Sequence, residues 1–117
     1  MDFETDEHFR ADVSLPDLTK LRAAFEKDGS VTPGNASGIN DGAAALVLAS
    51  ASAAVAKNMP VLARIVASGL GGVRPEVMGL GPVPAVTEAL SQAGLTISDM
   101  ACIESNEAFA AQACAVA

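Results

Sequence analysis

The sequence predicts an α/β fold, because short apolar runs typical of buried strands alternate with stretches of helical periodicity. At 117 residues the length fits one domain, and 50% of the residues are hydrophobic while only 3% are aromatic. We therefore expect a core of small side chains packed close to the backbone. The apolar runs lie at 43–48, 61–68 and 100–103, and the helical stretches at 15–25, 50–57, 84–93 and 108–117.

The charge balance excludes some classes of partner. Lys and Arg number 7 against 14 Asp and Glu, and this net charge of −7 argues against nucleic acid, because phosphate neutralisation needs clustered basic residues. Basic residues concentrate before residue 31, which leaves open a local site for an anionic small molecule: Arg10, Lys20, Arg22 and Lys27. The sequence contains neither a signal-peptide pattern nor an apolar stretch of membrane-spanning length, so we expect a soluble cytoplasmic protein.

A helix and a Gly-rich loop come first along the chain. Ser14 to Asp17 is a helix start, with Pro16 in the first turn, and we expect that helix to continue to Phe25. In the loop at 31–42, three glycines allow positive φ or close approach of another group. The loop is either a long turn between core elements or a ligand loop. The run at 43–48 has no polar face, which predicts a strand or a helix covered on both sides.

The middle of the chain contains a helix, a strand, a long loop and a second helix. The Ala-rich helix at 50–57 is stopped before Pro60. Residues 61–68 are rich in β-branched side chains, which favours a strand. The loop at 69–84 is long enough to be functional or disordered. Pro84 is expected to open a helix that runs to Ala93 and ends at Gly94.

The last segment is expected to form a short capped turn, a buried strand and a helix. Ser98 or Asp99 would cap the turn, and 100–103 would be the strand. The helix at 108–117 has no polar or glycine residue to end it, so the sequence stops inside a helical pattern.

Asn106 and Glu107 lie at the predicted junction between that strand and that helix. Side chains at such junctions can point into a crevice and bind a ligand. The alternative is that Ser105 or Asn106 only caps the helix, which is the commoner role for these residue types.

The other reactive residue types carry weaker signals. Cys102 and Cys114 show no CxxC spacing and no cationic neighbour, which predicts buried, inert cysteines rather than a nucleophile, a disulfide or a metal site. His8 is the only histidine and lies in a charged stretch typical of a surface.

Two long motifs resemble the thiolase family, which comprises acetyl-CoA acetyltransferases and 3-ketoacyl-CoA thiolases. The loop VTPGNASGINDGAA at 31–44 is similar to a loop of that family, and NEAFA at 106–110 is similar to its NEAF motif. Segments 6–10 and 78–85 match the family in the same order. The resemblance implies a layered αβαβα sandwich of two similar halves. Residues 1–35 would then end the loop domain, 36–58 would close the first half, and 61–117 would open the second.

The resemblance also implies a reaction and a site. Thiolases condense or thiolytically cleave acyl-CoA thioesters through an acyl-cysteine. By resemblance, Asn106 holds a water in an oxyanion hole, Ser37 contacts the pantetheine arm of coenzyme A, and Arg10 lies near its nucleotide end. The positions that would line the substrate tunnel are Phe25, Pro33, Ala108 and Phe109.

The family's nucleophilic cysteine and general-base histidine match nothing in this chain, so the chain alone is expected to be inactive. The resemblance implies coenzyme A thioesters as substrates, with no separate cofactor, no metal, no nucleic acid and no membrane. It implies a homodimer or homotetramer for the parent protein and a place in fatty acid metabolism. The alternative is a non-catalytic scaffold, interaction or lipid-carrier protein that keeps the half-fold.

Overall fold

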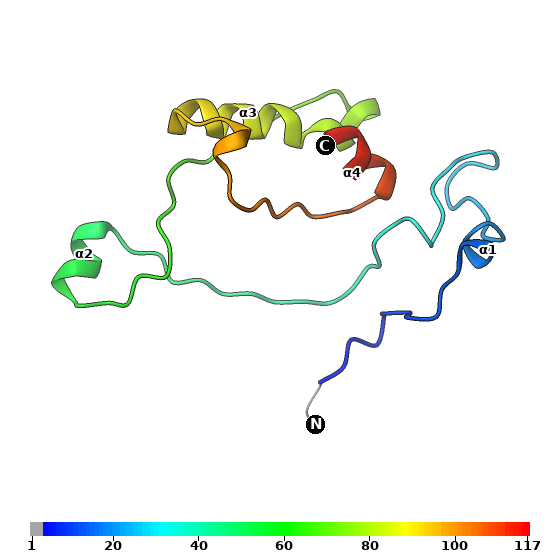
Figure 1. Ribbon diagram of the computed structural model, residues 1–117, viewed down its shortest axis with the longest axis horizontal. Coiled ribbons are helices and arrows are strands. Elements are labelled where there is room, and N and C mark those ends of the chain that lie inside the picture. The colour runs from blue at the N-terminus through cyan, green and yellow to red at the C-terminus, as the bar shows by residue number, and fades with distance from the viewer. Residues whose placement is uncertain (1–3) are drawn as a thin grey trace. The chain divides into compact units, whose positions relative to one another are not determined.

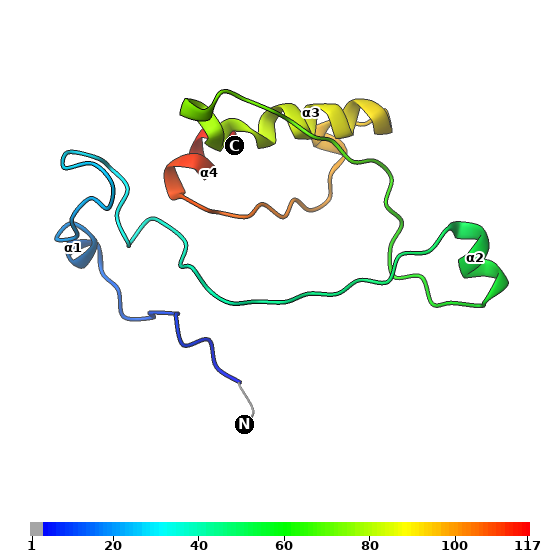
Figure 2. The same ribbon diagram turned by 180° about the vertical axis from the view of Figure 1, so that it is seen from behind.

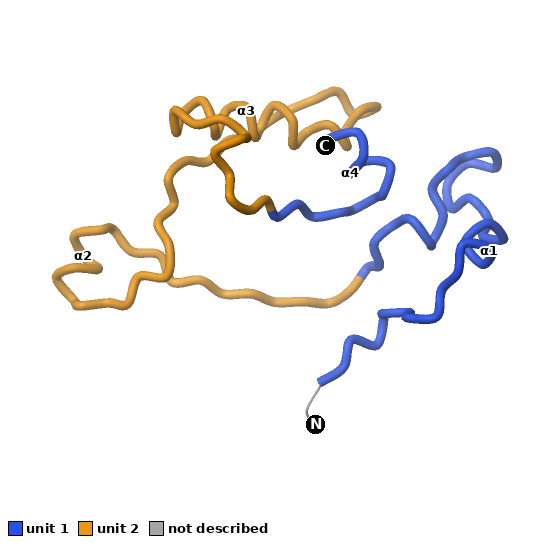
Figure 3. Tube along the Cα trace, viewed as in Figure 1, with its two compact units in different colours: residues 1–39, 104–117 blue, residues 40–103 orange. Residues whose placement is uncertain are grey.

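The computed structural model describes residues 4–117, which divide into two compact units. One unit contains residues 1–39 and 104–117, and the other contains residues 40–103 (Figure 3). The first part of the loop motif, residues 31–39, and the motif at 106–110 are distant along the chain and therefore come together within the first unit. Within the described residues, every helix falls short of the length and apolar character that crossing a bilayer requires.

The first unit contains two short helices, α1 (Leu15–Leu18) and α4 (Ala110–Val116) (Figure 1). Helix α1 starts where its sequence predicts, because the Ser14 backbone N–H donates to Asp17 Oδ2 at 3.3 Å and the Ser14 hydroxyl bonds the same carboxylate. The expected continuation to Phe25 is wrong. The chain leaves the helix at Thr19, and four residues form too short a helix to persist without packing.

The second unit contains α2 (Ala51–Ala56), η1 (Pro75–Leu80), α3 (Pro82–Ala93) and η2 (Ile97–Asp99), where η denotes a 3₁₀ helix. Helix α2 confirms the expected element, and the Ser50 hydroxyl caps it by accepting from the Ala53 N–H at 3.2 Å. The expected cap of η2 is wrong, because Thr96 holds the N-cap position and Asp99 closes the turn from its other end.

Helix α3 begins two residues earlier than the sequence predicts, at Pro82, and ends as predicted. Gly94 follows it with φ 66° and donates to the Leu90 and Ser91 carbonyls, a left-handed ending that glycine adopts without a Cβ clash. The predicted loop at 69–84 is partly wrong, because η1 occupies its second half.

The glycines in the first half of that loop allow the backbone to pack on α3. A Cβ atom at Gly69 would lie 2.0 Å from the Ala85 carbonyl oxygen, and one at Gly71 would lie 2.6 Å from the Ala85 backbone nitrogen. The segment runs alongside α3 in both views (Figure 1 and Figure 2). This close approach, rather than a ligand or disorder, accounts for the glycines at 69 and 71.

The two predicted strands, and the run at 43–48 that is expected to be a strand or a helix, form neither ladders nor helices in the described part of the chain. Residues 43–48, 61–68 and 100–103 carry no strand assignment (Figure 1). Leu46 is 88% exposed and Leu62 is 100% exposed, so the expected burial is also wrong there. A strand is stabilised by a neighbouring strand and a covering layer, and these runs have neither within residues 4–117.

Candidate functional site

The two sequence motifs pair through their backbones. Ala36 and Phe109 form an antiparallel bridge. The Ser37 N–H donates to the Ala108 carbonyl at 2.9 Å, and the Ala110 N–H donates to the Asn35 carbonyl at 2.9 Å. The pairing places Ser37 beside the segment that follows Asn106, although some 70 residues separate them in sequence.

A compact turn at 30–35 leads into this bridge. The Asn35 amide spans it, because Oδ1 accepts from the Thr32 N–H at 2.8 Å and Nδ2 donates to the Ser30 carbonyl at 2.9 Å. The Gly34 N–H donates to Thr32 Oγ1 at 3.2 Å. Pro33 is exposed at the tip, where its fixed φ suits a turn and its missing N–H leaves no donor unpaired.

Two glycines of the loop are in close contact with earlier residues. A Cβ at Gly38 would lie 2.6 Å from His8 Nε2, so the imidazole ring lies directly against the Gly38 backbone. A Cβ at Gly34 would lie 2.6 Å from Leu18 Cδ2. The close approach expected of these glycines is therefore confirmed at 34 and 38, whereas nothing lies within 4 Å of such an atom at Gly42.

The His8 contact also brings the Arg10 segment to the loop. Arg10 lies two residues beyond His8, and both are exposed, as the sequence predicts for His8. The His8 N–H donates to Asp6 Oδ1 at 3.0 Å, which bends the chain there. A basic side chain and the Ser37 hydroxyl therefore belong to the same unit.

Asn106 does not cap a helix. The N-cap position of α4 belongs to Phe109, which provides no side-chain hydrogen bond, and both Asn106 and Glu107 are exposed. The capping alternative is therefore wrong, and the amide of Asn106 remains available to contact a ligand. Ala108 and Phe109 are half-buried beside the bridge.

The cysteines lie differently from their predicted positions. Cys102 and Cys114 are both exposed, so the expectation of buried cysteines is wrong. The reason is the small core, because Ala54 is the one hydrophobic side chain that residues 4–117 bury. Within the described residues, no group of His, Cys, Asp and Glu side chains is arranged to hold a metal ion.

Phe25 lies apart from the bridge in the same unit. Its ring is 77% exposed and lines a shallow pocket of about 300 Å³ together with residues 26 and 29–31. The Ala24 N–H donates to the Val31 carbonyl at 2.8 Å and closes the loop that presents this ring. The structure thus brings Ser37, Ala108 and Phe109 together through the backbone bonds of the bridge, while Phe25 lies beside Ser30 and Val31 at the start of the turn.

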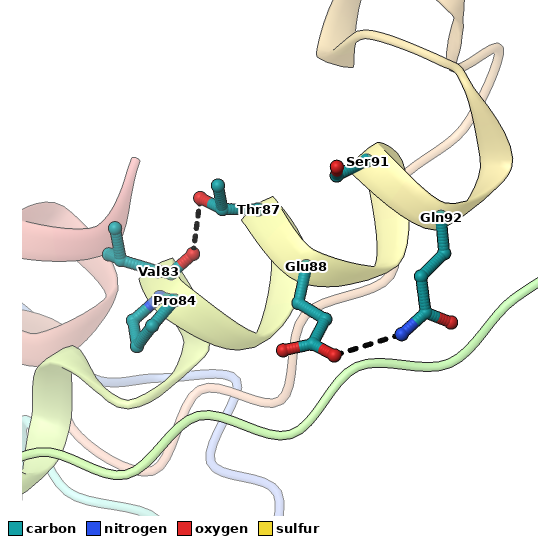
Figure 4. Close-up of a pocket in the computed structure, with 6 residues that line it drawn as sticks. All are labelled: Val83, Pro84, Thr87, Glu88, Ser91 and Gln92. Carbon is teal, nitrogen blue, oxygen red and sulfur yellow. Dashed lines mark hydrogen bonds between the residues drawn. The ribbon is translucent and has the colours of Figure 1, made fainter.

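The larger hollow lies in the other unit, on the surface of α3, and contains none of the candidate residues. It measures about 630 Å³ and is lined by one face of a single helix (Figure 4). Two hydrogen bonds run along the helix there, since Thr87 Oγ1 donates to the Val83 carbonyl at 2.8 Å and Gln92 Nε2 donates to Glu88 Oε1 at 2.9 Å. All of its lining residues come from one helix, whereas ligand sites usually combine polar groups that converge from several elements.

The two perturbed carboxylates serve helix ends rather than chemistry. The hydrogen bond from the Ser14 hydroxyl, followed by the Lys20 ammonium at 3.2 Å, lowers the pKa of Asp17. The Thr96 backbone N–H, followed by its hydroxyl, lowers the pKa of Asp99. Both groups are ionised at neutral pH, and neither is a candidate general base.

Sequence reasoning missed the roles of Asn35 and His8 in forming this site. The glycines of the loop were the one sequence feature that could have indicated these contacts, because a glycine often occupies a position where another segment lies close to the backbone. Which residue would be that partner depends on the fold.

Two family models match the chain. The model for the thiolase N-terminal domain matches residues 1–52, and the model for the thiolase C-terminal domain matches residues 59–117.

The relatives share about half of their aligned residues with this chain. A beta-ketothiolase of Cupriavidus necator is 56% identical over 115 residues, and an acetyl-CoA acetyltransferase of Pseudomonas aeruginosa is 54% identical over 114 residues. Each alignment covers 97% of this chain and 29% of the relative. The chain thus spans less than a third of the length of the curated relatives it matches.

Solved structures agree with the sequence matches. Human mitochondrial 3-ketoacyl-CoA thiolase in complex with CoA superposes with a TM-score of 0.92 at 50% identity. The acetyl-CoA acetyltransferase of Bacillus anthracis superposes with a TM-score of 0.91 at 51% identity. Both matches cover 97% of this chain and 29% of the other chain.

Proposed function

The chain belongs to the thiolase family, and we propose that a longer protein containing it transfers acyl groups through an acyl-cysteine. Its substrates are acyl-CoA and 3-ketoacyl-CoA thioesters such as acetoacetyl-CoA. Coenzyme A enters as substrate or product, and no separate cofactor takes part. The names of the relatives, which are thiolases and acetyl-CoA acetyltransferases, support this proposal.

The backbone pairing of the two motifs is the observation that carries the proposal. It holds Ser37 and the Asn106 segment in one unit, through the two 2.9 Å hydrogen bonds on either side of the Ala36–Phe109 bridge. A thioester needs one contact for its pantetheine arm and another for its carbonyl oxygen. The proposal gives Ser37 the first contact and Asn106 the second.

The chemistry follows from where charge develops. A cysteine thiolate from outside this chain attacks the thioester carbonyl, the C–S bond to coenzyme A breaks, and the coenzyme A thiolate leaves with the electron pair. The carbonyl oxygen carries negative charge in between. The amide of Asn106 orients a water toward that oxygen, and a fixed donor of this kind lowers the barrier by about 3 kcal/mol.

The remaining candidate residues bind the substrate. Arg10 attracts the phosphates at the nucleotide end of coenzyme A, consistent with its exposed position near His8. The apolar positions that line the path of the acyl and pantetheine groups are Phe25, Pro33, Ala108 and Phe109.

The whole protein is proposed to have the layered αβαβα architecture and to assemble as a homodimer or homotetramer in the cytoplasm. Residues 1–35 end the loop domain, 36–58 close the first half, and 61–117 open the second. In that architecture, neighbouring strands and helices cover the apolar runs that are exposed here, including Leu46 and Leu62.

Steady-state thiolysis of acetoacetyl-CoA by the full-length protein tests the proposal. Asn106→Ala should lower kcat by about 10² to 10³, because it removes a preorganised donor. Ser37→Ala should raise the KM for coenzyme A by about two- to tenfold, the effect of one neutral hydrogen bond.

Gln92→Ala is the matched control, because it removes an exposed side-chain hydrogen bond on α3 and should change neither constant. An unchanged kcat in Asn106→Ala would remove the assigned role. A full-length sequence without a reactive cysteine before this segment, or without a histidine and a cysteine motif after it, would overturn the acyltransferase assignment.

A further inference from the structure

Asn35 uses its side chain and its N–H in the turn at 30–35 and its carbonyl in the bridge that follows. Its side chain accepts from the Thr32 N–H at 2.8 Å and donates to the Ser30 carbonyl at 2.9 Å. Its backbone N–H donates to the Thr32 carbonyl at 3.1 Å, and its carbonyl accepts from the Ala110 N–H at 2.9 Å. The residue is half-buried and links the turn to the first residue of α4.

The bonds of Asn35 determine how the two motifs approach each other. The side chain holds the turn closed, and the carbonyl of the same residue forms one of the two hydrogen bonds of the bridge. The other hydrogen bond begins at Ser37, two residues further on. A change in the turn therefore shifts Ser37 and the segment after Asn106 together.

We propose that Asn35 is a positioning residue that couples the pantetheine contact of Ser37 to the carbonyl contact of Asn106. This inference rests on the proposed function for the roles of those two residues. Asn35 does not touch the reacting atoms in this proposal. It acts by keeping the turn at 30–35 and the bridge at 36 and 109 in one geometry.

The chemistry of the turn explains why an asparagine is needed. The position requires an acceptor facing the Thr32 N–H and, from the same planar group, a donor facing the Ser30 carbonyl. Aspartate has the same size but places an acceptor against that carbonyl. Alanine provides neither group, and serine keeps a hydroxyl that can restore one of the two bonds.

A double-mutant cycle in the full-length protein tests the coupling. Asn35→Asp and Asn35→Ala should each raise the KM for coenzyme A by about tenfold and lower kcat, and Asn35→Ser should recover part of the loss. Ser37→Ala should have a much smaller further effect in the Asn35→Ala background than in the wild type, because Ser37 is already displaced there.

A residue that only stabilised the fold would lower Tm and leave the Ser37→Ala effect undiminished. Additive effects of the two substitutions, or an unchanged KM in Asn35→Asp, would overturn the proposal. Gln92→Ala is again the matched control, since it loses a side-chain hydrogen bond of the same length in the other unit.

Hydrogen exchange separates failure of this inference from failure of the proposed function. Peptides covering 35–40 and 108–114 should exchange faster in Asn35→Asp, because displacement of the turn weakens the bonds from the Ser37 and Ala110 amides to the backbone carbonyls of Ala108 and residue 35. Unchanged exchange in both peptides would refute the inference. If exchange is faster in Asn35→Asp but the wild-type full-length protein shows no thiolysis, the proposed function alone is refuted.

Discussion

At the scale of single residues, the site depends on side chains that lie against backbone. The imidazole of His8 lies on Gly38, and the methyl groups of Leu18 and Leu21 lie on Gly34. Each contact requires the absence of a Cβ on the loop side. These contacts bring the segment that carries Arg10 to the loop that carries Ser37.

Gly38→Ala should destabilise the protein modestly, because the added methyl group would clash with the His8 ring. The added methyl group would lie 2.6 Å from His8 Nε2, so the exposed ring must rotate away. We expect a loss of about 1 kcal/mol in the free energy of unfolding and a rise of a few-fold in the KM for coenzyme A. Thermal unfolding and thiolysis kinetics of the full-length protein measure both effects.

His8→Ala in the same protein should relieve the clash. The double variant should therefore unfold at a higher temperature than Gly38→Ala alone. Equal Tm values for Gly38→Ala with and without the His8 substitution would contradict the contact.

At the scale of elements, α3 is the longest helix and the one with the best-defined ends. Pro82 and Pro84 occupy its first turn, where their missing N–H groups are not needed, and Gly94 ends it in the left-handed conformation. The backbone of residues 69–71 lies so close to the backbone of α3 that a methyl group on Gly69 or Gly71 would clash with it.

Gly69→Ala should therefore destabilise the protein strongly. Its Cβ would lie 2.0 Å from the Ala85 carbonyl oxygen and 2.7 Å from the Ala89 nitrogen, and backbone atoms of a helix cannot rotate away as a side chain can. We expect a loss of at least about 2–3 kcal/mol, measured by chemical denaturation of the full-length protein.

Gly72→Ala is the matched control three residues along the same segment. No atom lies within 4 Å of a Cβ built there, so its stability should stay within about 0.5 kcal/mol of the wild type. If Gly69→Ala and Gly72→Ala lose similar free energies of unfolding, the close approach of residues 69–71 to α3 is not the cause of the destabilisation.

At the scale of the whole chain, most large apolar side chains are exposed. Four large apolar side chains are each more than 85% exposed: Ile39, Leu46, Leu62 and Leu70. Among the described residues, Ala54 is the one hydrophobic residue that is buried. Apolar surface of this kind associates with other apolar surface.

The 117-residue polypeptide on its own should therefore self-associate and show no thiolysis. The apolar runs at 43–48 and 61–68 would meet those of other copies, and by family resemblance the nucleophilic cysteine and the base lie outside these residues. Light scattering after size exclusion and an acetoacetyl-CoA cleavage assay measure the two outcomes. A monodisperse monomer, or turnover that disappears with Cys102→Ala or Cys114→Ala, would contradict the prediction.

Local chemistry was readable from the sequence, and long-range pairing was not. The Ala-rich helix α2, the Gly94 ending and the start of α1 follow from neighbouring residues alone, and two long motifs sufficed to identify the thiolase family. The predicted strands at 61–68 and 100–103 and the strand or helix expected at 43–48 are absent, because such runs need neighbours to cover them and periodicity does not reveal whether neighbours are present. The bridge between Ala36 and Phe109 likewise depends on contacts across some 70 residues, and only the folded chain determines them.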